Sequence, residues 1–133
     1  MKIKNKLSIL GFHTVNVILI IFYVYPGSIL GCFLYNNCNI QPQITPNLMI
    51  YSNYLISSNH IYVFAILSVL GIFAYGNTRK IKFLIIYLFL LTIILELFHI
   101  IIPNRGFEWG DLFGNMLGLL FAIIIYKVKN RYV

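Results

Sequence analysis

Four long apolar runs, separated by short polar or charged segments, constrain this sequence more than any other feature. They cover about residues 7–25, 60–76, 83–102 and 111–126. A helix needs roughly 20 apolar residues to cross a bilayer, and a shorter run can be extended by a turn. The chain is 60% hydrophobic and only 10% charged, whereas soluble domains have about 25% charged residues. The sequence therefore predicts one all-α domain, 1–133, that spans a membrane with four transmembrane helices.

Basic residues cluster on one side of this predicted bundle. All but Arg105 precede the first run, separate the second from the third, or follow the fourth: Lys2, Lys4, Lys6, Arg79, Lys80, Lys82, Lys127, Lys129 and Arg131. Because cytoplasmic flanks collect Lys and Arg, both termini are predicted to lie inside. The formal charge of +7 thus indicates topology rather than a nucleic-acid partner. We expect a multi-pass protein of the cell (plasma or inner) membrane.

A basic start followed by an apolar stretch is also the general form of a signal peptide. The first run is longer than a typical signal, however, and no A-x-A-like cleavage site follows it. We expect this run to remain as a span.

The segment 26–58 carries no charge and is predicted to be an outer loop. Its opening, GSILGCFLY, is apolar but too short to span, which is typical of an interfacial or re-entrant piece. Cys32 and Cys38 lie here, where an oxidising compartment permits a disulfide. Two unpaired small apolar residues are the equal alternative.

All acidic residues lie between positions 96 and 111, around the turn that joins the last two runs. Glu96 and His99 share a helix face at i and i+3, and Asp111 and Asn115 share one at i and i+4. Because the turn 103–110 is short, the two helices must be antiparallel neighbours. The sequence therefore predicts a polar site near the outer interface.

Glu96 is the residue of this site whose burial in the membrane costs the most free energy. An ionisable group costs about 2.5–3.5 kcal/mol at the centre of a span, so it usually faces the bundle interior with a partner. Arg105 and His99 are the partners we expect. In the structural alternative, Glu96 and Arg105 simply lock the helical hairpin.

A metal site is a further alternative, since Glu96, His99, Asp111 and His60 are residue types that suit zinc. Without a second motif the pattern is weak, and we expect these residues to satisfy one another, with no metal and no cofactor. His13 and Asn16 share a face of the first span and are expected to form interhelical hydrogen bonds.

Small and aromatic residues occupy the start of the fourth run. Gly110, Gly114 and Gly118 allow a neighbouring helix to approach closely, either within the bundle or, alternatively, in a homodimer. Trp109, beside Phe107, is typical of an interfacial anchor, with stacking on a sugar or a drug as the alternative.

At these residues the sequence resembles the VanZ-like family, membrane proteins named for a member associated with resistance to the glycopeptide antibiotic teicoplanin. The likeness covers about residues 59–122 and rests on Glu96, Pro103, Arg105, Asp111, Asn115 and Gly118, with His60 at the start of the second span. Ile56 and Ser57 stand where the family often has Asp and Lys, and His99 where it commonly has Gln. The resemblance implies a place in the cell envelope but no particular reaction.

Site and resemblance together predict a cell-envelope protein that binds an amphiphile, either a membrane lipid or lipid-linked precursor or a lipoglycopeptide antibiotic, and that contributes to glycopeptide resistance. The expected ligand-binding residues are His60, Glu96, Arg105, Trp109, Asp111 and Asn115. One alternative is a membrane-embedded hydrolase or transferase with Glu96 or Asp111 as general base and His60 or His99 as its partner. Another is a small scaffold or transporter subunit.

Overall fold

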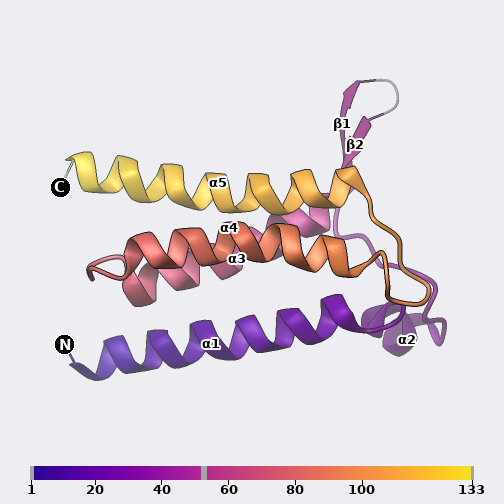
Figure 1. Cartoon of the computed structure of the whole chain (residues 1–133), viewed down its shortest axis with the longest axis horizontal. Helices are drawn as coiled ribbons and strands as arrows, with labels where there is room; N and C mark the ends of the chain where they lie inside the picture. Colours follow the sequence, from indigo (N-terminus) through magenta and orange to yellow (C-terminus); the bar gives the residue numbers. More distant parts are fainter. Residues whose placement is uncertain (1, 52–53, 133) are drawn as a thin grey trace.

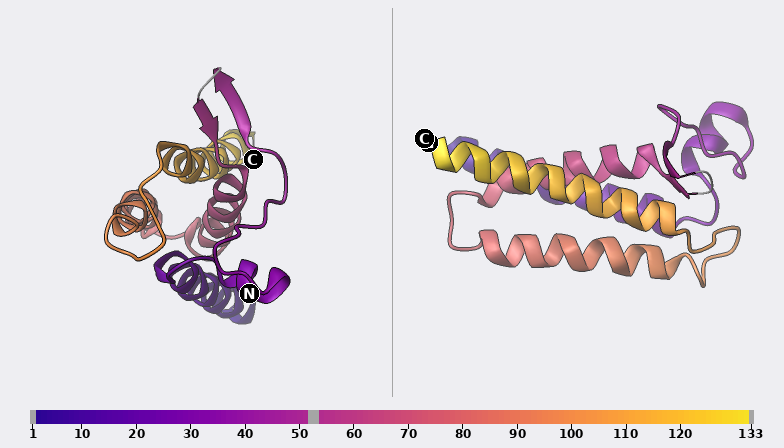
Figure 2. Two further views of the ribbon diagram at one scale, coloured as in Figure 1. Left: turned by 90° about the vertical axis from the view of Figure 1, so that its right-hand side faces the viewer. Right: turned by 90° about the horizontal axis from the view of Figure 1, so that it is seen from above.

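Four long helices lie side by side and form the body of the molecule (Figure 1). The computed structural model describes residues 2–51 and 54–132. Its long helices are α1 (Lys2–Val24), α3 (Ser58–Tyr75), α4 (Ile81–Phe98) and α5 (Trp109–Tyr132). Each is long and apolar enough to cross a membrane. The predicted all-α bundle of four spans is confirmed, and the view along the bundle in Figure 2 shows the helices grouped around a common interior.

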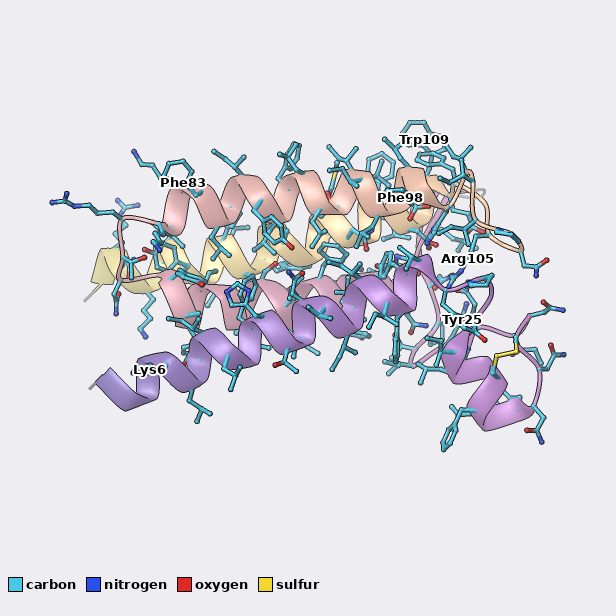
Figure 3. The ribbon with its side chains drawn as sticks, turned by 60° about the horizontal axis from the view of Figure 1, so that its bottom comes forward. Lys6, Tyr25, Phe83, Phe98, Arg105 and Trp109 are labelled. Atoms are coloured by element: carbon cyan, nitrogen blue, oxygen red, sulfur yellow. A yellow bond between two sulfur atoms is a disulfide. The ribbon has the colours of Figure 1, made fainter. Side chains whose placement is uncertain are left out.

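The two ends of the bundle differ in character. Both termini and the turn between α3 and α4 lie at one end, here called the terminal end (Figure 1). The segment between α1 and α3 and the loop between α4 and α5 lie at the other, here called the loop end. Figure 3 shows Lys6 at the terminal end and Arg105 at the loop end. The clustered basic residues therefore share one end, as the charge pattern predicts, and the cytoplasmic assignment of that end rests on the same pattern.

Helix boundaries differ from the predicted spans by four residues or more in three places, the first being the start of α1 at Lys2 instead of residue 7. α4 ends at Phe98, and residues 99–102 continue as tight turns in which His99 N–H donates to the Glu96 carbonyl (3.1 Å). A last turn of this kind is common where a proline, here Pro103, prevents the helix from continuing. α5 extends to Tyr132, beyond the predicted 126, because basic residues can continue a helix outside the apolar layer.

The segment between α1 and α3 contains a short helix and a hairpin that the sequence did not indicate. Helix α2 (Ile29–Tyr35) begins where Ser28 Oγ accepts a hydrogen bond from Gly31 N–H (3.0 Å). Strands β1 (Leu48–Tyr51) and β2 (Tyr54–Ile56) pair antiparallel, while positions 52–53 of the predicted outer loop lie outside the described residues.

Cys32 and Cys38 are joined by a disulfide beside α2. The bond decides between the two alternatives that the sequence left open for these cysteines. It agrees with the prediction that this segment faces an oxidising compartment.

Three glycines bring α5 close to its neighbours, two of them against the start of α3 and one against β2. A Cβ atom added at Gly114 would lie 2.6 Å from the Ser57 carbonyl oxygen, and one added at Gly118 would lie 2.7 Å from the Ala65 nitrogen. Gly110 likewise faces the backbone of Leu55. The glycines therefore serve packing within the bundle. The alternative of a homodimer through Gly110, Gly114 and Gly118 stays a prediction, although contacts within the chain already lie against these glycines.

Polar residues of α1 near the terminal end bond to the neighbouring helices, as predicted. His13 Nε2 lies 2.8 Å from the Tyr75 hydroxyl on α3. Asn16 Nδ2 donates to the Tyr87 hydroxyl on α4. These four residues, named the terminal-end cluster below, connect α1 to α3 and α4. The polar residues of the loop end are not part of these connections.

Candidate functional site

A group of polar side chains is enclosed where the four long helices meet at the loop end. Its members, named the loop-end cluster, are Tyr23 from α1, His60 from α3, Glu96 from α4, His99 just after α4, and Asp111 and Asn115 from α5. Glu96 and Asn115 are 0% exposed and His99 is 1% exposed. Ionisable groups so deeply enclosed in an apolar bundle are costly, which makes their exact partners informative.

Tyr23, Asn115 and His60 form a hydrogen-bonded triangle. The Tyr23 hydroxyl donates to Asn115 Oδ1 (2.7 Å), and His60 Nδ1 lies 3.1 Å from that oxygen and 2.9 Å from the hydroxyl oxygen. Since the hydroxyl proton is already used, both neighbours of Nδ1 act as acceptors. With the Asn115 amide in this orientation, neutral His60 has its proton on Nδ1 and a lone pair on Nε2.

The lone pair of His60 faces a carboxylate. His60 Nε2 lies 3.3 Å from Asp111 Oδ2. A carboxylate oxygen can only accept, so this contact is attractive only if a further proton or a cation lies between the two atoms.

Glu96 is held from the start of α5 rather than by a basic side chain. Its Oε1 accepts a hydrogen bond from Glu108 N–H (2.9 Å), where the positive end of the α5 dipole favours an anion. Its other oxygen, Oε2, is buried and has no hydrogen-bond partner within the described ranges. Glu96 thus closes the α4–α5 turn with Oε1, while Oε2 faces the imidazole of His99.

His99 faces Glu96 in the same way as His60 faces Asp111. His99 Nδ1 lies 3.4 Å from Glu96 Oε2, and His99 Nε2 lies 3.2 Å from the Tyr23 carbonyl oxygen. The carbonyl can only accept, so a neutral His99 carries its proton on Nε2. The predicted Glu96–His99 pair is present, but it too requires an additional positive charge to be attractive.

The predicted Glu96–Arg105 pair is not formed. No ion pair links Arg105 to a carboxylate in the part of the chain that the structure describes. Arg105 instead donates through Nη2 to the Phe22 carbonyl (3.3 Å), and its Nε is buried without a hydrogen-bond partner among those residues. Partial burial lowers the pKa of Arg105, and the nearby Asp111 carboxylate opposes that shift. The hairpin lock that the sequence suggested is made by the Glu108 backbone in its place.

Arg105 lines a cavity of about 110 Å³ at the loop end. His60 and His99 contribute polar lining, while Phe22 and Leu30 contribute apolar lining from α1 and α2. A guanidinium, two imidazoles and apolar side chains therefore meet in one small space.

Trp109 belongs to a different surface. Its side chain is 61% exposed and meets Phe107 edge to face, with ring centroids 4.9 Å apart. It lines a separate cavity of about 370 Å³ with Glu108 and Asp111. The predicted binding set is thus divided: His60, Glu96, Asp111 and Asn115 meet in the loop-end cluster, Arg105 lines its own cavity beside them, and Trp109 lies apart at the same end of the bundle (Figure 3).

Tyr23 is a member of the site that the sequence analysis missed. It follows Asn16 by seven residues, which places both on one face of a helix. His13, Asn16 and Tyr23 together form a polar stripe on an otherwise apolar span, and this stripe is the signal that could have identified Tyr23.

Four apolar helices that enclose polar groups define a polytopic membrane protein. No family model, curated protein or solved structure matches the chain. The residues of the site are therefore the basis for any more specific function.

Proposed function

We propose that this protein is a VanZ-like cell-envelope protein that binds an anionic amphiphile in the cavity beside Arg105. The motif residues Glu96, Arg105, Asp111 and Asn115, which carry the family resemblance, all lie in or next to this site. The ligand class is a lipid-linked envelope precursor, with a lipoglycopeptide antibiotic as the alternative ligand and glycopeptide resistance as the phenotype that would follow.

The observation that carries the proposal is the guanidinium of Arg105, which forms no ion pair with any residue that the structure describes. A partly buried cation without a counterion is costly, and a buried N–H group without an acceptor adds to that cost. A phosphate or carboxylate would accept two parallel hydrogen bonds from a guanidinium fork. An anionic headgroup therefore supplies what Arg105 lacks.

Cavity size and lining indicate which part of an amphiphile would enter. Pockets for drug-sized ligands measure roughly 300–1,000 Å³, whereas this cavity holds about 110 Å³. It suits a headgroup and not a whole antibiotic. Phe22, Leu30 and Val63 border the cavity and are each partly exposed, which offers apolar surface to the attached chain. The lipid-linked precursor is thus the better match.

Native mass spectrometry of the purified protein with polyprenyl phosphate, and with neutral polyprenol as the matched ligand, tests the proposal. We expect the phosphate to bind and Arg105→Ala to weaken binding about tenfold to hundredfold, as expected for loss of a charge-assisted hydrogen bond. Arg79→Ala, a substitution at the terminal end, is the control and should bind normally. Equal binding by Arg105→Ala and wild type would refute the proposal.

A second candidate is a membrane-embedded hydrolase or transferase. The observation that favours it is the short separation of its proposed acid–base groups, 3.3 Å for His60 and Asp111 and 3.4 Å for His99 and Glu96, close to the roughly 2.6–3.2 Å needed for proton transfer. Phosphate release from polyprenyl diphosphate, abolished in Asp111→Asn, is the result this candidate requires. Binding without turnover would leave the amphiphile-binding function alone.

A further inference from the structure

We propose that His60, Glu96 and Asp111 form a binding site for one divalent metal ion of the zinc class. This site adjoins the Arg105 cavity, which His60 also lines, and the proposal does not rest on whether that cavity binds an amphiphile. It also departs from the sequence-based expectation that the loop-end cluster holds no metal.

The three ligand atoms are close enough to share one ion. One ligand atom from each residue lies within 4.8 Å of the others, although the residues come from three different helices. Zinc binds nitrogen and oxygen at about 2.0–2.2 Å, so ligand atoms in a tetrahedral site are about 3.4 Å apart. The His60 Nε2 to Asp111 Oδ2 distance of 3.3 Å already meets this value. The Glu96 oxygen, which lies within 4.8 Å of the other two atoms, has to approach by up to about 1.4 Å.

When both histidines are neutral, the hydrogen bonds among the described residues leave His60 Nε2 and Glu96 Oε2 without a donor. The Tyr23–Asn115 pair fixes the proton of neutral His60 on Nδ1, which directs the Nε2 lone pair toward Asp111. Glu96 Oε2 is fully enclosed and accepts no hydrogen bond from any described residue. A divalent cation would convert these opposed lone pairs into three bonds.

The surroundings resemble the support that metal ligands usually have. A ligating histidine generally donates its second N–H to an oxygen acceptor, as His60 Nδ1 can do toward Asn115 Oδ1 (3.1 Å). Ligating carboxylates are usually oriented by hydrogen bonds as well, and Glu108 N–H holds Glu96 through Oε1.

Ligand number and type favour zinc over calcium or magnesium. Calcium takes six to eight oxygen ligands, and magnesium demands an octahedron of oxygens. One imidazole with two carboxylates instead suits a transition metal with three protein ligands, which leaves one coordination position for water or for a group of a bound molecule.

Cobalt(II) is the probe that tests the proposal directly, because it enters zinc sites and absorbs visible light. The full chain, freed of any affinity tag and stripped with a chelator, is titrated with Co²⁺ in detergent micelles. We expect saturation at about one ion per chain with the spectrum of a four- or five-coordinate nitrogen–oxygen site. Zn²⁺ should displace the cobalt and Mg²⁺ should not. Absence of saturable Co²⁺ binding by the wild-type protein would overturn the proposal whatever the variants do.

Matched variants assign the ligands. Asp111→Asn and Glu96→Gln keep the side-chain shapes and should each weaken Co²⁺ binding by about tenfold to hundredfold or more. Loss of a group that only orients a metal ligand already has an effect of about this size. His13→Gln changes a histidine outside the site and should bind as the wild type does. Unchanged affinity in Asp111→Asn, or an equal loss in His13→Gln, would contradict the assignment.

Discussion

The two polar clusters of this bundle contain similar types of side chain but differ in how these side chains are paired. The terminal-end cluster joins the hydroxyls of Tyr75 and Tyr87 to an imidazole and an amide, and its four members include no carboxylate. The loop-end cluster encloses two carboxylates whose nearest imidazole nitrogens carry lone pairs. Cavity size does not separate the two, since the cavity beside the terminal-end cluster is the larger, about 360 Å³ against 110 Å³. The balance of donors, acceptors and charge distinguishes a structural contact from a candidate site.

The most informative test of this difference between the two clusters is to remove the charge of Glu96. Glu96→Gln keeps an oxygen for Glu108 N–H and removes a buried charge, so we expect the free energy of unfolding to change by less than about 1 kcal/mol. Ligand or metal binding should fall by tenfold or more, as argued above for a group in a working site. Circular dichroism melts in detergent and native mass spectrometry measure the two quantities.

Glu96→Ala is the matched comparison, because it also removes the acceptor. It leaves Glu108 N–H unpaired and should lower the free energy of unfolding by about 1–3 kcal/mol. If Glu96→Gln melts as early as Glu96→Ala yet binds its ligand fully, then Glu96 is a structural residue and the comparison fails.

Tyr23→Phe tests the hydrogen-bonded triangle of the loop-end cluster. Loss of the hydroxyl leaves Asn115 Oδ1 without its best donor, which should cost about 1–2 kcal/mol in unfolding free energy. The change should also loosen His60 and weaken Co²⁺ binding, so a Co²⁺ titration accompanies the melt. Destabilisation with unaltered Co²⁺ affinity would place Tyr23 outside the working part of the cluster.

Tyr87→Phe makes the equivalent change in the terminal-end cluster. Interhelical hydrogen bonds in membrane proteins are worth about 0.6 kcal/mol on average, and we expect a loss of that size. Binding of Co²⁺ and of polyprenyl phosphate should be unchanged. An effect on either ligand would show that the two clusters are coupled.

The smallest expected effect concerns pH and Glu108, which lies in the loop beside the loop-end cluster. Burial raises the pKa of Glu108, and the Asp111 and Glu96 carboxylates raise it further. The folded state therefore holds the Glu108 proton more tightly than the unfolded state, and its contribution to stability is lost as the pH rises through the folded pKa. Glu108→Gln should be more stable than wild type at neutral pH by about 0.5 kcal/mol or less, with the difference vanishing in acid. Melts at a series of pH values would show this, and a difference that grows in acid would have the wrong sign.

Helix positions were predictable because hydropathy and length govern them directly. The spacing of residues along a helix likewise predicted that Glu96 shares a face with His99, and Asp111 with Asn115. The hairpin β1–β2 was not predictable, because its position depends on a contact distant in sequence, with Ser57 N–H donating to the Gly110 carbonyl (3.2 Å).

Relations between helices and within the turn were harder to predict. The sequence does not state how α1 is rotated against its neighbours, so Tyr23 escaped notice. The conformation of the α4–α5 turn also decided the partner of Arg105. Asn104 adopts a left-handed backbone (φ 59°), which asparagine tolerates better than most residues, and Arg105 next to it then reaches the end of α1 instead of Glu96.

The close approach of α3 and α5 has a mechanical consequence for the loop-end cluster. With the Gly114 and Gly118 backbones against α3, the two helices have little freedom to slide, so His60 and Asp111 stand on one stiff support. Glu96 stands on α4, which packs far less extensively against that pair. An ion held by all three residues would act as a clasp between a rigid half of the bundle and a looser one. Metal binding should therefore slow amide hydrogen exchange at the loop end of α4.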